Sequence, residues 1–269
     1  MMKKITLAIA LILSATIMLT AQDNKSSENE TSSANTENKE VKKSKSNSGS
    51  SFHFGLKASP SLSWLKPNSK YLLHDGNKLN INGGLIMDFN FTDNYAFSTG
   101  FEISTFGGKL AYPSSNKDSV FYNTSETDSI PFLLTTRNHK LRYVNIPITL
   151  KLKTNQIGAM VYYGQFGFDL GLRWRAMADD DGTQKAILTT NKDVEIQEEI
   201  GFFRLALNVG LGVEYNLVGN TSLLVGVNYN NGFTNSFRKD SKFLRDKDSQ
   251  RLKQDAFANY VALSVGVLF

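Results

Sequence analysis

Eight stretches of this 269-residue sequence alternate apolar and polar residues over lengths typical of membrane-crossing strands, and they predict an all-β fold. The even number of strands and the regular alternation of short and long connections predict an eight-stranded antiparallel up-and-down transmembrane β-barrel. A short apolar leader at the N-terminus predicts export from the cytoplasm, which such a fold requires.

The clearest alternation covers residues 203–217. Every odd position from Phe203 to Leu217 is apolar, whereas the even positions are small, polar or charged, as in Arg204, Asn208 and Glu214. A period of two residues predicts a strand with two unlike faces. Strands of soluble proteins usually have about 5 or 6 residues, and a tilted strand needs about 9 to 11 to cross a bilayer. This stretch is long enough to cross.

Seven further stretches share this pattern: 52–64, 79–91, 95–105, 142–152, 160–175, 221–230 and 259–269. Tight turns are predicted at 92–94, 154–156 and 218–220, and long polar loops at 66–78, 106–141, 176–202 and 231–258. Short and long connections alternate, so the turns gather at one rim of the barrel, the turn rim, and the loops at the other, the loop rim. Outer-membrane barrels have this arrangement.

Alternation alone does not decide whether the apolar face points outward, because a lipocalin-like soluble barrel turns its apolar face inward. Aromatic residues of the apolar face lie at two heights, as in the girdles at the two membrane interfaces, which favours an outward, lipid-facing orientation. The loop-rim girdle is predicted to contain Trp64, Trp174, Phe203 and Tyr229, and the turn-rim girdle Phe52, Phe91, Tyr95, Tyr162, Tyr215 and Phe269. The terminal Phe269 resembles the aromatic signal that the barrel assembly machinery reads, so this machinery is an expected partner during biogenesis.

The N-terminal region divides into two segments. Residues 1–21 have Lys3 and Lys4 before an apolar run that is too short for an anchor helix, so they are predicted to be a cleaved signal peptide. Residues 22–51 are rich in Ser, Asn, Glu, Thr and Lys, and we expect a disordered periplasmic tether. The barrel domain then covers 52–269. The expected location is the outer membrane of a Gram-negative bacterium, with extracellular long loops.

Composition excludes several classes of site and partner. The chain has no cysteine, which rules out disulfides, thiolate metal sites and a lipid-modified N-terminal cysteine. The net charge is +5, but both signs are mixed along most of the chain, so no nucleic-acid partner is expected. Outer-membrane lipid and other envelope proteins are the expected partners.

Charged residues on the polar face are predicted to fill the lumen, which in an eight-stranded barrel is about as wide as its side chains. The predicted lumen set is Lys57, Lys151, Arg173, Arg175 and Arg204 with Asp88, Glu102, Asp169 and Glu214. The near balance of charge favours an interior salt-bridge network, because isolated buried charges are costly. The alternative is that Arg173, Arg175 and Arg204 form an anion-attracting mouth at the loop rim.

No catalytic, cofactor-binding or metal-binding residues are predicted, and enzymatic activity is not expected. His53, His74 and His139 are scattered, and only His139 falls near the loop rim with acceptors. The acidic run Asp179–Gly182 lacks the alternating ligand spacing of a calcium loop, so a solvated acidic loop is expected there.

The last long loop is rich in cations that could attract lipid phosphates or an acidic partner, although a solvated hairpin extension is an equally good interpretation. These cations are Arg238, Lys239, Lys242, Arg245, Lys247, Arg251 and Lys253.

One motif resembles a known family. Tyr143, Ile146, Pro147, Leu150 and Lys151 form a Tyr-x-x-Ile-Pro-x-x-Leu-Lys pattern similar to that of the PorT-type outer-membrane β-barrel family of Bacteroidetes. The segments 54–58 and 163–167 extend the likeness.

The family resemblance covers residues 52–269 and implies a barrel without specifying its role. We expect a structural or accessory protein whose loops or tether bind other envelope components; a narrow porin and a type IX secretion system subunit are the alternatives. Pro147 lacks an N–H, so a bulge or a hydrogen-bond gap is expected in its strand.

Overall fold

The computed structural model describes residues 51–69, 72–112, 120–122, 132–217, 219–238, 240–241, 244–245 and 250–269. The predicted signal peptide and nearly all of the predicted tether lie outside these residues. The strands are β1 (Ser51–Pro67), β2 (Leu73–Gly76), β3 (Lys78–Thr92), β4 (Tyr95–Ala111), β5 (Phe121–Tyr122), β6 (Phe132–Lys153), β7 (Met160–Gln184), β8 (Ile187–Glu195), β9 (Phe203–Asn216), β10 (Ser222–Gly232), β11 (Leu244–Arg245) and β12 (Ala256–Leu268); a short 3₁₀ helix, η1, covers Gln197–Glu199. No helix in the described part of the chain is long and apolar enough to cross a membrane.

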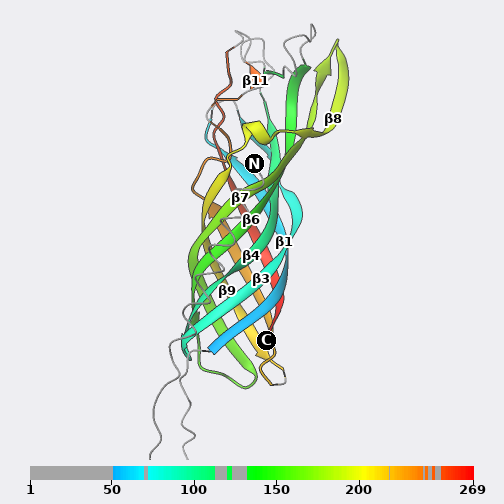
Figure 1. Cartoon of the computed structure of the whole chain (residues 1–269). Helices are drawn as coiled ribbons and strands as arrows, with labels where there is room; N and C mark the ends of the chain where they lie inside the picture. Colours follow the sequence, from blue (N-terminus) through cyan, green and yellow to red (C-terminus); the bar gives the residue numbers. More distant parts are fainter. Residues whose placement is uncertain are drawn as a thin grey trace, which may run out of the picture. The chain divides into compact units, whose positions relative to one another are not determined.

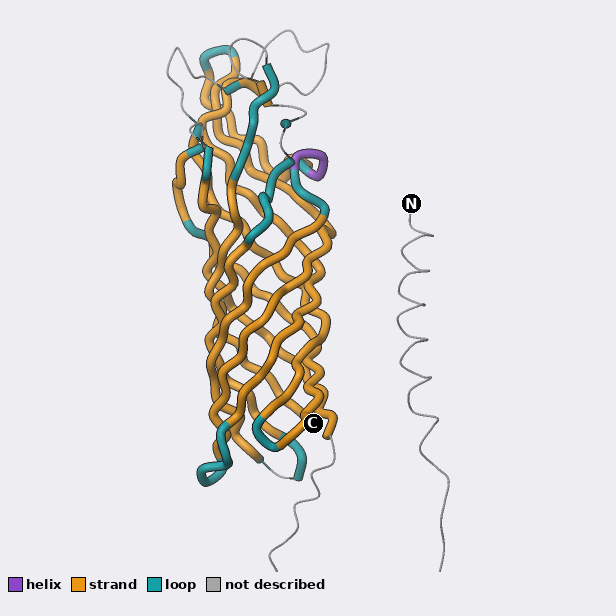
Figure 2. Tube along the Cα trace, turned by 90° about the vertical axis from the view of Figure 1, so that its left-hand side faces the viewer, coloured by secondary structure: helices purple, strands orange, loops and turns teal. Residues whose placement is uncertain are grey.

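Eight of these strands form a closed antiparallel ring. The hydrogen-bonded order is β6-β4-β3-β1-β12-β10-β9-β7, and pairing between β6 and β7 closes it. Each strand pairs with its neighbours in the chain, and β1 pairs with β12, which is the up-and-down topology. The strands are steeply tilted and wind around one axis (Figures 1 and 2). The predicted fold class is therefore confirmed.

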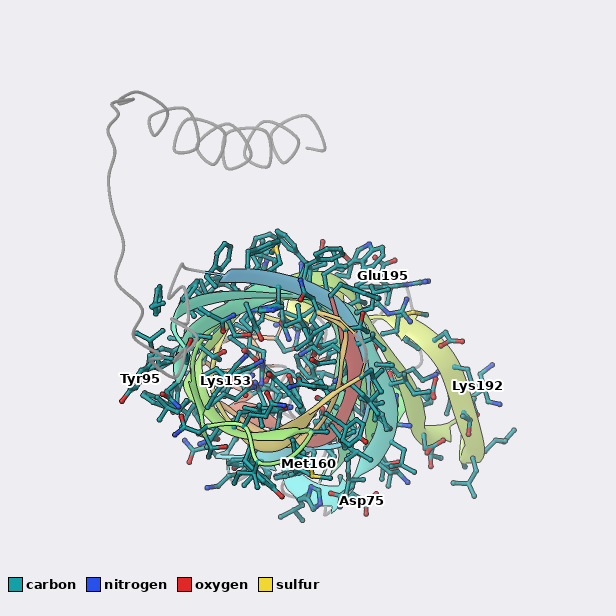
Figure 3. The ribbon with its side chains drawn as sticks, turned by 90° about the horizontal axis from the view of Figure 1, so that it is seen from below. Asp75, Tyr95, Lys153, Met160, Lys192 and Glu195 are labelled. Carbon is teal, nitrogen blue, oxygen red and sulfur yellow. The ribbon has the colours of Figure 1, made fainter. Side chains whose placement is uncertain are left out.

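The predicted strands coincide with the eight ring strands, but the predicted long loops are more ordered than expected. Strand β4 continues to Ala111, β6 begins at Phe132, and β7 runs on to Gln184 before the hairpin to β8. The prediction that 106–141 and 176–202 are simply loops was therefore wrong. The β7–β8 hairpin projects away from the ring, as Figure 1 and Lys192 in Figure 3 show.

The barrel has two halves with opposite interiors. In the half near the turns, the turn half, charged side chains such as Asp88 and Lys151 are buried while Leu211 on the outer face is 69% exposed. In the half beyond Trp174, the loop half, Phe106 and Leu141 are fully buried inside in an apolar cluster.

The switch between these halves is visible along single strands. On β4, Phe101 and Ile103 are about half exposed on the outer face, whereas Phe106 and Leu110 are fully buried inside. Because successive side chains of a strand point to opposite faces, the apolar residues change from odd to even positions where the exterior changes. On β4 the outer face therefore changes from apolar to polar near residue 105.

Candidate functional site

Lys151 is the centre of the lumen in the turn half. Its Nζ lies 2.5 Å from Oδ2 of Asp88 and 3.1 Å from Oε1 of Glu214, and these side chains are 1%, 0% and 7% exposed. Lys153, which the sequence analysis did not include, binds the other Glu214 oxygen at 2.9 Å. The Lys151 ammonium also lies 4.8 Å from the ring centroid of Tyr163. Two cations and two carboxylates thus fill this level of the barrel.

A second ion pair joins Lys57 on β1 to Glu102 on β4. Ser104 donates a hydrogen bond of 2.6 Å to Oε1 of Glu102, and the Asn145 amide donates to the Ser104 hydroxyl at 2.9 Å. These hydrogen bonds satisfy oxygens that the ion pair leaves free, which a buried pair needs in order to offset its desolvation.

Asp169 and Arg204 are joined through an amide. Asp169 accepts hydrogen bonds from Asn208 at 3.0 Å and from Asn230 at 2.5 Å, and the Asn230 side-chain oxygen accepts from Nη2 of Arg204 at 2.5 Å. The Arg204 guanidinium lies 4.6 Å from the ring centroid of Phe106. Arg204 therefore stands at the boundary between the polar and apolar interiors.

Arg173 closes the polar lumen at the loop side. Its Nη1 donates to the backbone carbonyls of Gln197, the first residue of η1, and Ile200, the residue after η1. One nitrogen of the guanidinium is thus bound to the backbone at the loop side of the lumen.

Arg175 does not lie in the lumen, so its predicted position was wrong. Alternation would place Arg175 inside with Arg173, but the β6–β7 register shifts between Arg142 and Tyr143, so that one extra residue, Trp174, is inserted in β7. Beyond this β-bulge Arg175 is exposed on the outer face. Arg173, Arg175 and Arg204 consequently do not form the anion-attracting mouth.

A charged cluster in the loop half was missed by sequence reasoning. Arg137 is fully buried; its Nε and Nη2 bind the two Asp180 oxygens at 2.6 and 2.7 Å, and its Nη1 binds Glu199 at 2.8 Å. Ser241 donates to the other Glu199 oxygen at 2.7 Å. Burial would lower the pKa of Arg137, but the hydrogen bonds and charge of Asp180 and the charge of Glu199 raise it. The cluster ties β6, β7, η1 and the last loop together.

His139 lies inside the same half, with its ring packed edge-on against Phe237 at 5.2 Å between centroids. Burial, followed by the positive charge of Arg137, lowers the pKa of His139 to about 3. His139 is therefore a neutral core residue at physiological pH.

The acidic residues that follow Ala178 in β7 bind basic and hydroxyl side chains of the protein itself. Asp179 binds Lys140 at 2.7 Å, Asp180 binds Arg137, and Asp181 accepts from Thr190 at 2.8 Å. Within the described residues no cluster of His and carboxylate side chains has the form of a metal site.

The cations of the last loop are only partly described. Arg238, Arg251 and Lys253 are exposed and Arg245 is half-buried, whereas Lys239, Lys242 and Lys247 lie outside the described residues.

The aromatic residues assigned to the girdles lie on the outer face. At the turn rim they are 41–59% exposed: Phe52, Phe91, Tyr95, Tyr162, Tyr215 and Phe269. At the loop rim Trp174, Phe203 and Tyr229 are 39–57% exposed, and Trp64 is less exposed because it stacks on Tyr229 with 6.4 Å between centroids. Figure 3 shows Tyr95 outside the ring of strands.

The motif residues divide between the faces of β6. Tyr143 and Lys151 are buried inside, and the Tyr143 hydroxyl donates to the Gly201 carbonyl at 2.7 Å. Ile146 and Leu150 share the outer face with Ile148.

Pro147 faces the lumen without a bulge. Its register with β7 is continuous, but the β4–β6 ladder passes from Thr99–Ile148 directly to Glu102–Asn145. The missing N–H of Pro147 therefore produces a gap in the pairing with β4, the second of the two expected consequences.

Two cavities lie along the turn half of the lumen. One of about 420 Å³ opens at the turn rim and is lined by polar residues that include His53, Lys153 and Glu214. The other has only about 30 Å³ and lies deeper, beside Lys57 and Lys151. The end-on view in Figure 3 shows side chains inside the ring of strands.

The closed antiparallel ring, the apolar outer belt with aromatic rims and the filled polar interior define a transmembrane β-barrel of the outer-membrane class. The chain belongs to the family of the outer membrane protein beta-barrel domain, whose model matches residues 21–238. A search of curated proteins finds no match.

Several solved structures are similar at low identity. OprG from Pseudomonas aeruginosa is 11% identical, with 82% of this chain and 97% of that chain covered and a TM-score of 0.43. Neisserial surface protein A is 11% identical, with 82% and 97% covered and a TM-score of 0.40. Ail of Yersinia pestis is 12% identical, with 81% and 98% covered and a TM-score of 0.36.

Proposed function

We propose that this protein is a non-enzymatic, PorT-type outer-membrane barrel that acts as a structural or accessory component, and that its loop half or its N-terminal segment binds other envelope components. In this proposal the turns and the segment before β1 face the periplasm, and the loop half faces the outside of a Bacteroidetes cell. The observation that carries the proposal is the filled lumen.

The lumen supports a role without transport. Lys151, Asp88 and Glu214 are buried together across the barrel, and the apolar cluster with Phe106 and Leu141 and the buried Arg137 cluster occupy the loop half. A pathway for solutes would need these groups to separate and to leave buried charges without partners, which is costly.

The loop half supports a role in binding. It is a packed unit with its own apolar core and the Arg137 cluster, so it can hold a fixed surface toward a partner. At the tip of the β7–β8 hairpin, Ile187 and Leu188 are 66% and 87% exposed. Exposed apolar residues on a projecting hairpin are suited to contact another protein.

Crosslinking in cells tests the binding role. A tagged full-length chain is crosslinked, extracted in detergent and analysed by quantitative mass spectrometry beside two variants, Ile187→Ser with Leu188→Ser, and a deletion of residues 22–50. We expect specific envelope proteins to be captured with the parent chain and at least tenfold fewer with one variant. If neither variant changes the set of neighbours, the binding role is wrong.

Planar-bilayer recording separates the proposal from a narrow porin. The parent chain should give no discrete conductance steps, with its insertion verified separately by co-flotation with lipid vesicles. Discrete steps from the parent chain would overturn the proposal in favour of the porin.

The PorT-like motif makes a secretion-system subunit the second candidate, because the family it resembles takes its name from a component of the type IX secretion system. Deleting the gene and measuring export of type IX cargo tests this candidate. Unchanged export removes it and leaves the binding role in place.

A further inference from the structure

Two arginines lie opposite each other on the outer wall of the barrel. Arg142 on β6 and Arg175 on β7 are direct cross-strand partners, and both are exposed. The neighbouring outward pair on these strands, toward the turns, is Val144 and Leu172, which belongs to the apolar belt. The arginine pair therefore lies at the edge of the lipid-facing surface, beside Trp174 of the loop-rim girdle.

The bulge in β7 creates this pair. A regular ladder would point Arg175 into the lumen, but the register shift at Arg142 and Tyr143 turns it outward next to Trp174, which is 57% exposed. Bulges commonly re-aim a side chain at a functional position.

Two like charges directly opposite each other on a sheet repel and destabilise the pairing unless an anion lies between them. Neither the Arg142 nor the Arg175 guanidinium has a hydrogen bond or ion pair with any residue that the structure describes. One step further from the belt, Lys140 has two carboxylate partners, Asp179 at 2.7 Å and Asp193 at 3.0 Å. The same wall thus neutralises one cation with protein groups and leaves the arginine pair open.

We propose that Arg142 and Arg175 bind the phosphate group of a membrane lipid in the leaflet on the loop side. Guanidinium groups bind phosphate oxygens through two parallel N–H bonds, and interfacial aromatic residues such as Trp174 mark the depth of lipid head groups. Thr105 on β4 is the cross-strand partner of Arg142, and its hydroxyl can supply a third donor. The site rests on the outward orientation of the apolar belt and is independent of any protein partner.

Native mass spectrometry of the full-length protein in detergent tests the site. The chain is titrated with lipid A, with lipid A whose phosphates have been removed, and with inorganic phosphate as a competitor. We expect the parent chain to retain lipid A at least tenfold better than the dephosphorylated form. Arg142→Gln with Arg175→Gln should abolish that preference, while Lys140→Gln, one row away, should keep it.

Three outcomes decide the proposal. Equal retention of the two lipids by the parent chain, or an unchanged preference in the double arginine variant, overturns it. Displacement of lipid A by millimolar inorganic phosphate would show that the pair binds free anions instead of a lipid, which also overturns it. Arg142→Lys with Arg175→Lys, which retains both charges on the exposed wall, guards against misfolding and should show a weakened but measurable preference.

The outcome is separable from that of the proposed function. A failed lipid preference leaves captured protein neighbours unaffected, and a failed capture leaves the lipid preference unaffected.

Discussion

The turn half and the loop half use the same strands to build opposite structures. In the turn half the interior holds Lys151 and Asp88 and the exterior shows Leu211, whereas in the loop half Leu141 and Phe106 are inside. A side chain is placed by what surrounds the wall: acyl chains select apolar residues outside, and water selects polar ones. The comparison teaches that the same eight strands can place apolar side chains outside along one part of their length and inside along the other.

Removing Lys151 should have the largest effect. Lys151→Met leaves Asp88 buried without its cation and Glu214 with Lys153 alone, and the expected loss is about 3–5 kcal/mol in the free energy of unfolding. Urea unfolding in lipid vesicles, followed by tryptophan fluorescence, measures it. Leu150→Met, which faces outward on the same strand, should change stability little, and equal losses for both would contradict the lumen network.

A lysine placed on the outer wall should discriminate between the halves. Ile148→Lys lies on the outer face of the turn half and should destabilise the barrel by about 2–4 kcal/mol in lipid. Asn138→Lys lies on the outer face of the same strand in the loop half, where water is expected, and should cost less than about 0.5 kcal/mol. Similar costs at both positions in vesicles would remove the distinction between the halves.

The loop half should weaken as the pH falls below 6.5. The pKa of His139 is lowered to about 3 in the folded state by burial and by Arg137, and its unfolded value is about 6.5. The stabilisation is therefore complete above pH 6.5 and is lost as the pH falls from 6.5 toward 3, by about 1.4 kcal/mol for each pH unit.

Hydrogen exchange of β6 to β8 amides at pH 7 and pH 5, corrected for intrinsic rates, measures this loss. His139→Phe should flatten the pH dependence of the loop half. Equal acid sensitivity in the parent chain and the variant would exclude His139 as its source.

The smallest expected effect is at the β7–β8 hairpin. Lys185 and Ala186 have positive φ values of 52° and 62°, a turn geometry that usually uses Asn-Gly. Ala186→Gly should relieve the strain and stabilise the hairpin by about 0.5–1 kcal/mol. Slower proteolysis at the hairpin would show it, and Ala186→Val should act in the opposite direction.

Sequence reasoning predicted what depends on a period of two residues. The eight ring strands follow from alternation alone. The outward position of residues such as Phe203 and Tyr95 and the inward position of Lys151 and Asp169 follow from alternation together with the two heights of the aromatic residues. These features are local, because adjacent side chains of a strand must point to opposite faces.

The remaining features depend on where alternation changes. The strand predicted at 95–105 was too short. The apolar positions change from odd at Ile103 to even at Phe106 because the outer face becomes polar there, and β4 continues to Ala111. Arg175 was misplaced because one bulge residue reverses every later position. The partners of Arg137 come from distant segments, so no local pattern could pair it with Glu199. A change in the parity of apolar positions is the signal that could have extended the strands.

Lipid-contact mapping along β6 tests the two-half account most directly. The chain has no cysteine, so single cysteines from 134 to 152 can each carry a bimane label, and brominated phospholipid in vesicles quenches labels that touch acyl chains. We predict quenching at the even positions 144–152, and none at the odd positions or at 134–140. Quenching at Asn145 or Lys151, or continuous quenching through Asn138, would contradict the account.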